Sequence, residues 1–294
     1  MDTIEAVREA VVVGVDDRSV SRSAVFWAAE EARLRGLHLL IVHVGSEGGD
    51  WPDGDQALTR GLLLNASAEA ASRREPTVIV GTLLLRGDAG EQLVDISRSA
   101  AMLVLGSELG GPLSSRFNGL THRLASSGLC DVVTVSRTPK IDKTGLTQIL
   151  AVWTSEAERA GVLLTAAKEA TLRKAALTLA LPSSGPRASV SETEIADEHS
   201  AARDLSYLAS RYPGLHVTVD QIDPTSVAAV GSALTGCHLA VLGYRRKGST
   251  KSKAADLAHG LVRQATCPLL FPVGYVDDLR VPPDSVERRA VARR

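Results

Sequence analysis

The stretch VVVGVDDRSVSRSAVFWAAEEARLRGLHLLIVHV (residues 11–44) decides the fold class, because its pattern changes from strand to helix and back to strand. The run from Ala10 to Asp16 is short, β-branched and bounded by turn-forming residues, which is typical of a strand buried on both faces. The segment from Ser19 to Arg35 has apolar residues at helical spacing, and Gly36 is suited to end that helix. The closing run, LHLLIVHV, predicts a second strand. The stretch therefore indicates a strand–helix–strand unit.

The sequence from Gly45 to Ser136 continues this alternation. Strands that alternate with helices of about ten or more residues imply right-handed crossovers and a parallel sheet covered on both faces. We therefore expect a doubly wound, Rossmann-like α/β domain. The further elements that the pattern predicts are helices over 56–74, 91–101 and about 117–127, and strands over 77–85, 102–106 and 131–135.

Two octapeptides show that the chain contains an internal duplication. AAEEARLR occupies positions 28–35 and AAKEATLR occupies positions 166–173, and they agree at six of eight positions. Almost the same offset separates MLVLG at 102–106 from LAVLG at 239–243, and Cys130 from Cys267. A repeat of this length is typical of a duplicated domain.

The predicted boundary between the two copies lies in a polar segment that contains Pro139, Ser136 to Gly145, which is suited to a short linker. We assign residues 1–140 to a first domain and residues 141–276 to a second. Residues 277–294 combine prolines and charges with few apolar side chains, which predicts a largely disordered tail.

Composition narrows the functional class. The 33 basic and 34 acidic side chains nearly cancel, so we expect no overall field that collects nucleic acid or anionic membrane. Three cysteines, Cys130, Cys237 and Cys267, are too few and too widely spaced for a disulfide framework or a zinc site, and we interpret them as buried thiols. The N-terminal residues are acidic where a signal peptide is basic, and no long apolar run is present. These features predict a soluble cytoplasmic protein.

The loop VLGSELGGPLSSRFNG, Val104 to Gly119, is the first candidate for binding chemistry. It follows a predicted strand and precedes a predicted helix, so its N–H groups and the helix N-terminus could converge on a phosphate. A flexible crossover loop would favour the same residues, and both interpretations remain open. In doubly wound sheets ligands bind beyond the carboxyl ends of the strands, where the pattern places Asp16, Val44, Gly87 and Gly106.

The quoted 11–44 stretch, RGD at 86–88, and the sequences LVLGS and NGLTHRLASSGLCDVVTV together resemble a universal stress protein domain. The duplication makes the chain similar to tandem members of that family, and the likeness extends more faintly over 147–273. The resemblance implies that the last strands of the two domains, 131–135 and 268–273, pair antiparallel as a pseudo-dimer within one chain. It leaves open association of two chains.

For ligand, the resemblance implies an adenine nucleotide, ATP with or without magnesium, in the first domain. Asp16 would accept from the adenine or ribose edge, and the backbone of Val15 and Val44 would flank the base. Gly106 and Ser107 would start the phosphate loop, and Thr121 would supply its final hydroxyl. Leu109 replaces the second glycine of the family's loop. The implied set is Val15, Asp16, Val44, Gly87, Gly106, Ser107, Gly110, Asn118, Gly119 and Thr121.

The second domain lacks these features. Thr154 stands where Asp16 stands in the first, and Ala255 and Asp256 hold the positions of the loop's glycine and serine. A carboxylate there would repel phosphate, so we expect no ATP site of the family type. The five basic residues between Arg245 and Lys253 could dock an acidic partner or nucleic acid, but we interpret them as a solvated charge run.

No residue pattern indicates catalysis. His43 is interpreted as structural, Ser21 as a helix-capping residue, and His122 and His259 have no neighbouring metal ligands in sequence. We expect a regulatory protein whose nucleotide occupancy alters a surface read by an unidentified protein partner. Two alternatives stay open, a nucleotide-free interaction module and a slow ATP-hydrolysing enzyme, the latter without a recognisable water-activating group.

Overall fold

The computed structural model of the 294-residue chain describes residues 7, 9–16, 19–45, 54–107, 114–127, 129–136, 147–181, 192–244 and 253–273. The predicted boundary near residue 140 and the predicted tail at 277–294 lie outside these residues. We refer to the described residues up to 136 as the first half and to those from 147 as the second half.

The first half alternates strands and helices as its sequence predicts. Buried β-branched and leucine-rich runs form the strands, and alanine-rich amphipathic runs form the helices between them. The elements are β1 (Val11–Gly14), α2 (Ser19–Arg35), β2 (Leu39–Gly45), α3 (Gly54–Arg74), β3 (Val80–Arg86), α4 (Ala89–Ile96), β4 (Met102–Gly106), α5 (Ser114–Ser127) and β5 (Asp131–Val135).

The second half repeats this order, which confirms that the two copies share one fold. Its elements are β6 (Gln148–Val152), α6 (Glu156–Arg173), β7 (Ala176–Leu181), α7 (Glu192–Arg211), β8 (Val217–Gln221), α8 (Val227–Ala233), β9 (Leu239–Leu242), α9 (Lys253–Val262) and β10 (Leu269–Phe271).

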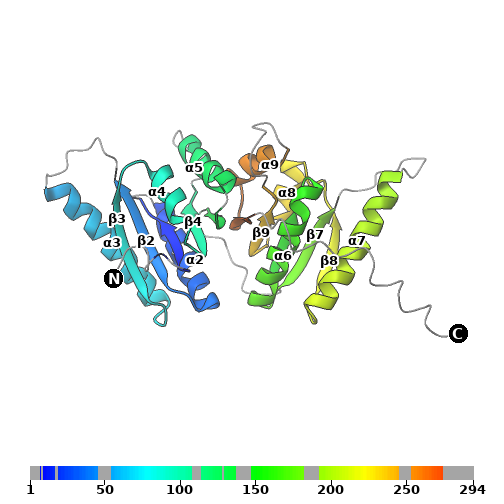
Figure 1. The fold of residues 1–294 in the computed structure, drawn as a ribbon, viewed down its shortest axis with the longest axis horizontal. Coiled ribbons are helices and arrows are strands. Elements are labelled where there is room, and N and C mark those ends of the chain that lie inside the picture. The colour runs from blue at the N-terminus through cyan, green and yellow to red at the C-terminus, as the bar shows by residue number, and fades with distance from the viewer. Residues whose placement is uncertain are drawn as a thin grey trace.

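All of these strands belong to one ten-stranded sheet, in the order β3-β2-β1-β4-β5-β10-β9-β6-β7-β8. Figure 1 shows the sheet running across the molecule, from β3 and α3 at one end to β8 and α7 at the other. Strands within each half are parallel, and β5 pairs antiparallel with β10 through Val132–Phe271, Val133–Leu270 and Thr134–Leu269. The expected pairing of the two last strands is therefore confirmed, although β10 is shorter than the predicted 268–273.

Two hydrophobic layers cover the sheet, which confirms the doubly wound architecture. One layer contains apolar residues of α2, α3, α6 and α7, and the other contains those of α4, α5, α8 and α9. Along β1, Val11 and Val13 face the first layer and Val12 faces the second, and all three are fully buried. Such burial on both faces explains why the strands are continuous apolar runs.

Three helices differ from the sequence prediction, at four boundaries. Helix α3 begins at Gly54 rather than residue 56. Helix α4 covers Ala89–Ile96 rather than 91–101. Its start is set by Asp88, which caps it by accepting from the Glu91 N–H at 2.9 Å. Helix α5 begins at Ser114 rather than residue 117. Side-chain caps and polar first turns carry little hydrophobic periodicity, so apolar spacing places helix starts poorly.

The repeated octapeptides meet where α2 packs on α6, in a cluster of four charged residues that we call the charge quartet: Glu31, Arg35, Glu169 and Arg173. Each arginine pairs with the glutamate one turn earlier on its own helix and with the glutamate of the other helix. Both glutamates are almost completely buried. The residues that revealed the duplication therefore hold the two copies together.

Candidate nucleotide site

The order of the strands places the candidate site between β1 and β4. These two strands are neighbours in the sheet, but the helix after β1 covers one face and the helix after β4 covers the other. A crevice forms at the carboxyl ends of the strands where the winding reverses in this way. Val15 and Asp16 follow β1, Gly106 ends β4, and Val44 lies near the end of β2, so four of the predicted residues meet at this edge.

Hydrogen bonds hold the chain in place as it leaves β1. The Val15 N–H donates to the Val42 carbonyl at 2.8 Å, and His43 Nδ1 lies 2.8 Å from the Val15 carbonyl oxygen. The interpretation of His43 as a structural, hydrogen-bonded residue is confirmed. Its ring ties the end of β2 to the end of β1, which sets the spacing of the two strand ends.

Asp16 and Ser21 form a reciprocal pair at the start of α2. The Ser21 hydroxyl donates to Asp16 Oδ1 at 2.6 Å and accepts from the Asp16 N–H at 3.1 Å. Ser21 is 6% exposed, whereas Asp16 is half-buried. The serine therefore fixes the direction of the carboxylate at the strand end, and sequence analysis had assigned it only to capping.

Ser107, predicted to start the phosphate loop, is 3% exposed. Its N–H donates to the Val135 carbonyl at 2.9 Å, and its hydroxyl donates to the Val262 carbonyl at 3.2 Å, at the end of α9 in the second half. Ser136 makes an equivalent bond of 2.6 Å to the Ala265 carbonyl. The two serines thus satisfy carbonyl groups at and just beyond the end of α9, where a helix leaves them without internal partners.

Three of the remaining predicted site residues lie in α5. Gly110 lies outside the described residues. Asn118 and Gly119 lie within α5, not in a loop ahead of it. Asn118 therefore does not adopt the left-handed conformation that asparagine tolerates. Thr121 lies further along α5, and at 6% exposure it faces the second half.

Gly87 lies where β3 leads into α4. Its φ of 121° is in the region that favours glycine, and its N–H donates to the Gly45 carbonyl at 2.9 Å. The following residue, Asp88, accepts from Arg123 of α5 at 2.9 Å. This bond joins α4 to α5 on an exposed surface beside the site, and sequence analysis did not identify it.

The corresponding strand ends in the second half hold a buried carboxylate, that of Glu158. The Thr154 N–H and hydroxyl both donate to Glu158 Oε2, at 3.0 and 3.2 Å. Glu158 is 8% exposed, and a Cβ on Gly243, the counterpart of Gly106, would lie 2.5 Å from Glu158 Oε2. The side chain thus occupies the space between the ends of β6 and β9. Its sequence signal was a glutamate in the first turn of the helix that follows Thr154.

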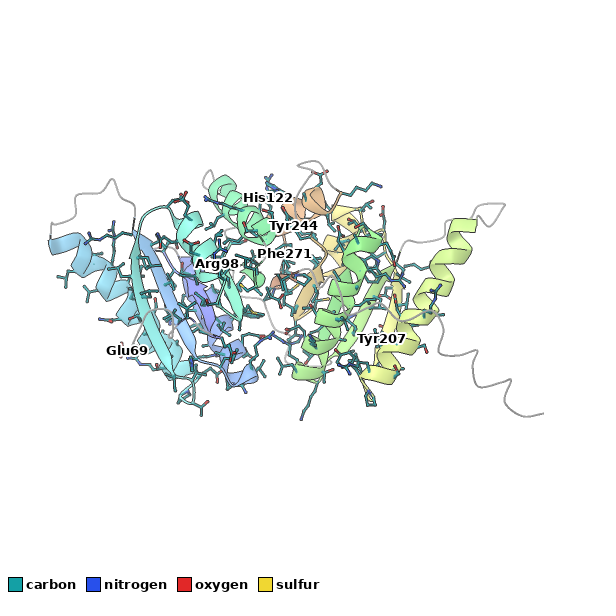
Figure 2. All side chains as sticks on the ribbon, viewed as in Figure 1. Glu69, Arg98, His122, Tyr207, Tyr244 and Phe271 are labelled. Carbon is teal, nitrogen blue, oxygen red and sulfur yellow. The ribbon has the colours of Figure 1, made fainter. Side chains whose placement is uncertain are left out.

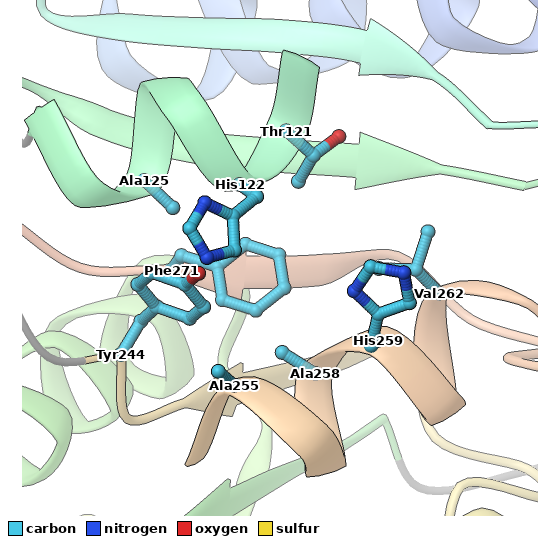
Figure 3. Close-up of a pocket in the computed structure, with 9 residues that line it drawn as sticks. All are labelled: Thr121, His122, Ala125, Tyr244, Ala255, Ala258, His259, Val262 and Phe271. Atoms are coloured by element: carbon cyan, nitrogen blue, oxygen red, sulfur yellow. The ribbon is translucent and has the colours of Figure 1, made fainter. Parts of the chain in front are cut away.

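A small cavity of about 20 Å³ separates α5 from α9 (Figure 3). His122 and His259, which hold equivalent positions in the two copies, line it from the two helices, together with Thr121 and Tyr244. The Tyr244 ring lies edge-on to His122 at 5.6 Å and to Phe271 at 5.7 Å, near the middle of the molecule (Figure 2). Burial raises the pKa of Tyr244 to about 12. The volume is that of about one water molecule, too small for a nucleotide.

The cysteines are buried thiols, as predicted, and burial raises the pKa of Cys130 to about 12 and that of Cys237 to about 11. Within the described ranges, no group of three or more metal-ligating side chains comes together. No helix in that part of the chain is long and apolar enough to cross a bilayer.

Comparison with known proteins identifies the family. The model of the universal stress protein family matches residues 8–136. Universal stress protein Rv3134c of Mycobacterium tuberculosis is 34% identical over 172 residues, which cover 56% of this chain and 61% of that protein. The match therefore spans less than two thirds of that relative. Universal stress protein Rv2624c of the same organism is 26% identical over 269 residues, 90% of this chain and 97% of that protein.

A solved structure of similar length has the same fold. A universal stress protein from Archaeoglobus fulgidus superposes with a TM-score of 0.70 at 11% identity, covering 92% of this chain and 99% of that one, which shows a shared fold. A shorter universal stress protein of the same organism, solved in complex with dAMP, is 26% identical and covers 44% of this chain and 98% of its own, with a TM-score of 0.36. The family match shows that the first half belongs to the universal stress protein family, and the whole chain is similar in sequence to members of that family.

Proposed function

We propose that the first half binds an adenine nucleotide, ATP with or without magnesium, at the carboxyl ends of β1, β2 and β4, and that the second half does not. The observation behind the proposal is the contrast between Asp16, whose half-buried carboxylate Ser21 orients at the strand end, and Glu158, whose buried carboxylate fills the same place in the other half. An oriented carboxylate can accept from an amino or hydroxyl group of a nucleoside.

Charge supports the assignment of one site per chain. A phosphate placed beside Gly243 would lie close to the Glu158 carboxylate in a partly buried setting, where like charges repel far more strongly than in bulk water. In the first half the equivalent glycine, Gly106, is followed by Ser107, whose polar groups the protein itself uses. Phosphate contacts there would therefore come from residues beyond Ser107, where Gly110 and the start of α5 lie in sequence.

A regulatory role follows from how the site is attached to the second half. Ser107 bonds to the end of α9 directly after β4, and Thr121 of α5 lines the cavity that α9 shares. A ligand that contacts the chain between β4 and α5 would therefore act on the α5–α9 contact. We propose that occupancy changes the surface formed by these two helices, and that a protein partner reads this change.

A nucleotide-free interaction module is the second candidate, and the engaged hydroxyl of Ser107 favours it. In that case the chain after β4 would serve to join the halves, and the strand-end carboxylate would act only as a structural partner of Ser21. The two candidates differ in whether any ligand stabilises the protein.

Thermal unfolding with and without excess Mg-ATP tests the proposal on three proteins: the wild type, Asp16→Ala and Glu158→Ala. Ligand at about a hundred times its dissociation constant stabilises the folded state by roughly 2.7 kcal/mol, so we expect a clear rise in the wild-type midpoint. Asp16→Ala should lose that rise, while Glu158→Ala, the matched change in the other half, should keep it. Midpoints without ligand show whether each variant is folded.

Two results would contradict the proposal. A wild type whose midpoint does not respond to nucleotide would favour the interaction module. A rise that survives Asp16→Ala but disappears in Glu158→Ala would move the site to the second half.

A further inference from the structure

A large cavity lies in the second half at the amino ends of the strands, opposite the carboxyl ends. Its volume is about 710 Å³, within the range of small-molecule sites. The ends of α6 and α7 and the starts of β6, β7 and β8 surround it, at the lower edge in Figure 1, and Figure 2 labels Tyr207 of α7 near this edge. The nucleotide proposal makes no use of this cavity.

The same place in the first half is bridged by an ion pair. Arg33, in the last turn of α2, pairs with Glu75, the residue directly after α3, at 2.9 Å. The repeated octapeptides align Arg33 with Thr171. Backbone hydrogen bonds show that Glu75 corresponds to Tyr212. The Val78 N–H donates to the Glu75 carbonyl in the first half, and the Leu215 N–H donates to the Tyr212 carbonyl in the second half. The two halves therefore share this backbone arrangement but not the ion pair, and the residues at the two equivalent positions in the second half line the cavity.

Lys174, which also lines the cavity, sits in a conformation that disfavours it. It ends α6 with φ 52° and ψ 42°, in the left-handed region, where the first half has Gly36 with φ 66°. For a residue with a Cβ this conformation costs of order 1 kcal/mol, whereas glycine adopts it freely. The second half thus replaces the favoured glycine with a cation at the wall of the cavity.

The charges of the cavity are all of one sign. Lys174 and Arg211 are the charged residues that line it, and none of its lining residues is an aspartate or a glutamate. Neither Lys174 nor Arg211 forms an ion pair with any other residue that the structure describes. Cations near helix C-termini stabilise helices on their own, so the helix ends explain either side chain alone. The helix ends do not explain why both cations line the same cavity, or why that cavity has no acidic residue in its lining.

The rest of the lining is partly polar and partly apolar. Gln148 Nε2 donates to Thr178 Oγ1 at 2.6 Å, and Thr178 Oγ1 lies 2.9 Å from Thr218 Oγ1, so amide and hydroxyl groups form a row across three strands. The apolar part of the lining consists of Ala170, Ala175, Ala176, Tyr212, Pro213 and Leu215. A ligand that fits this lining has an apolar body and an acidic group.

We propose that this cavity binds a small organic anion with an apolar body, its acidic group held by Lys174 and Arg211. Charged hydrogen bonds supply the affinity that a neutral molecule of the same shape would lack. The site is independent of the nucleotide site, since it lies at the other end of the strands and shares no residue with it.

A matched pair of fluorescent probes tests the proposal. Anilinonaphthalene sulfonate has an apolar body and one negative charge, and phenylnaphthylamine has the same rings without the charge. We expect the full-length wild type to bind the anionic probe, and Lys174→Gly and Arg211→Gln each to weaken that binding by about 3- to 10-fold. Binding of the neutral probe should change less than about 2-fold. Lys174→Gly suits the left-handed position, so the fold should be retained.

Two controls locate the effect. Arg203→Gln removes an exposed cation from the same helix, outside the cavity, and should leave the affinity for both probes unchanged. Asp16→Ala should also leave them unchanged, which separates this site from the nucleotide site. The proposal is overturned if the wild type does not bind the anionic probe, if Lys174→Gly and Arg211→Gln bind it as tightly as the wild type, or if both probes weaken equally.

Discussion

The two halves of this chain have the same strand order and differ at both ends of their strands. At the carboxyl ends, the first half has a carboxylate on the strand end and a hydroxyl on the helix, Asp16 and Ser21, whereas the second half has the reverse, Thr154 and Glu158. At the opposite ends, an ion pair spans the first half and a cavity lies in the second. Duplication preserved the packed core and changed the ends, and the carboxyl ends are where ligands bind in this fold.

The largest expected effect comes from the charge quartet, which the halves share. Glu169→Ala would remove one of the two glutamates that pair with both Arg35 and Arg173, at a site that is almost completely buried. Removing one partner of a buried ion pair costs about 3 kcal/mol or more. Urea unfolding should show this loss for Glu169→Ala and a similar loss for Glu31→Ala.

A double variant tests whether the two glutamates of the charge quartet act together. Because both glutamates serve the same two arginines, Glu31→Ala with Glu169→Ala should cost clearly less than the sum of the single changes if the four residues act as one unit. Strict additivity would show that each helix satisfies its own charges and that the contact between the halves does not depend on the quartet.

A smaller effect should distinguish the two sets of strand ends. A Cβ added at Gly243 would lie 2.5 Å from Glu158 Oε2 and 2.8 Å from Glu158 Cβ. We expect Gly243→Ala to destabilise the protein by about 2 kcal/mol, since forced overpacking typically costs about 1–3 kcal/mol. In the Glu158→Gly background, which removes both of these atoms, the same change should cost less than half as much. An equal cost in both backgrounds, measured by urea unfolding, would mean that Glu158 does not fill this space.

The smallest effect concerns the serines that join the halves. Ser107→Ala and Ser136→Ala each remove a donor to a carbonyl at or just beyond the end of α9. A buried hydrogen bond of this kind contributes about 1 kcal/mol, so each variant should unfold at a slightly lower urea concentration. If Ser107→Ala does not lower the stability, the Ser107 hydroxyl does not stabilise the contact with α9. It would then be available to bind phosphate, as the family resemblance implies.

Sequence reasoning predicted the fold because the signals for it are local. The β-branched runs at β1 and β2, the alanine-rich α2 and the near-constant offset between repeated segments were enough for the doubly wound halves. The family resemblance added the antiparallel β5–β10 pairing. Helix starts were less accurate, as at α4, where the cap from Asp88 moves the start from residue 91 to Ala89.

The candidate site was less predictable because its side chains depend on distant partners. Ser107 reads as a loop residue in sequence, but its hydroxyl bonds to a carbonyl 155 residues away. Glu158 reads as an ordinary helix residue, and its burial against Gly243 depends on how β9 lies beside β6 in the sheet. Asp16 was placed correctly at the strand end, and its partner Ser21 was not recognised as such.

Calorimetric titration of Mg-ATP into the full chain measures the stoichiometry of binding, and so shows whether one half alone binds nucleotide. We expect one site per chain, lost in Asp16→Ala and retained in Glu158→Ala. A stoichiometry of two, or heat that is unchanged by Asp16→Ala, would contradict this expectation, as would the absence of any binding.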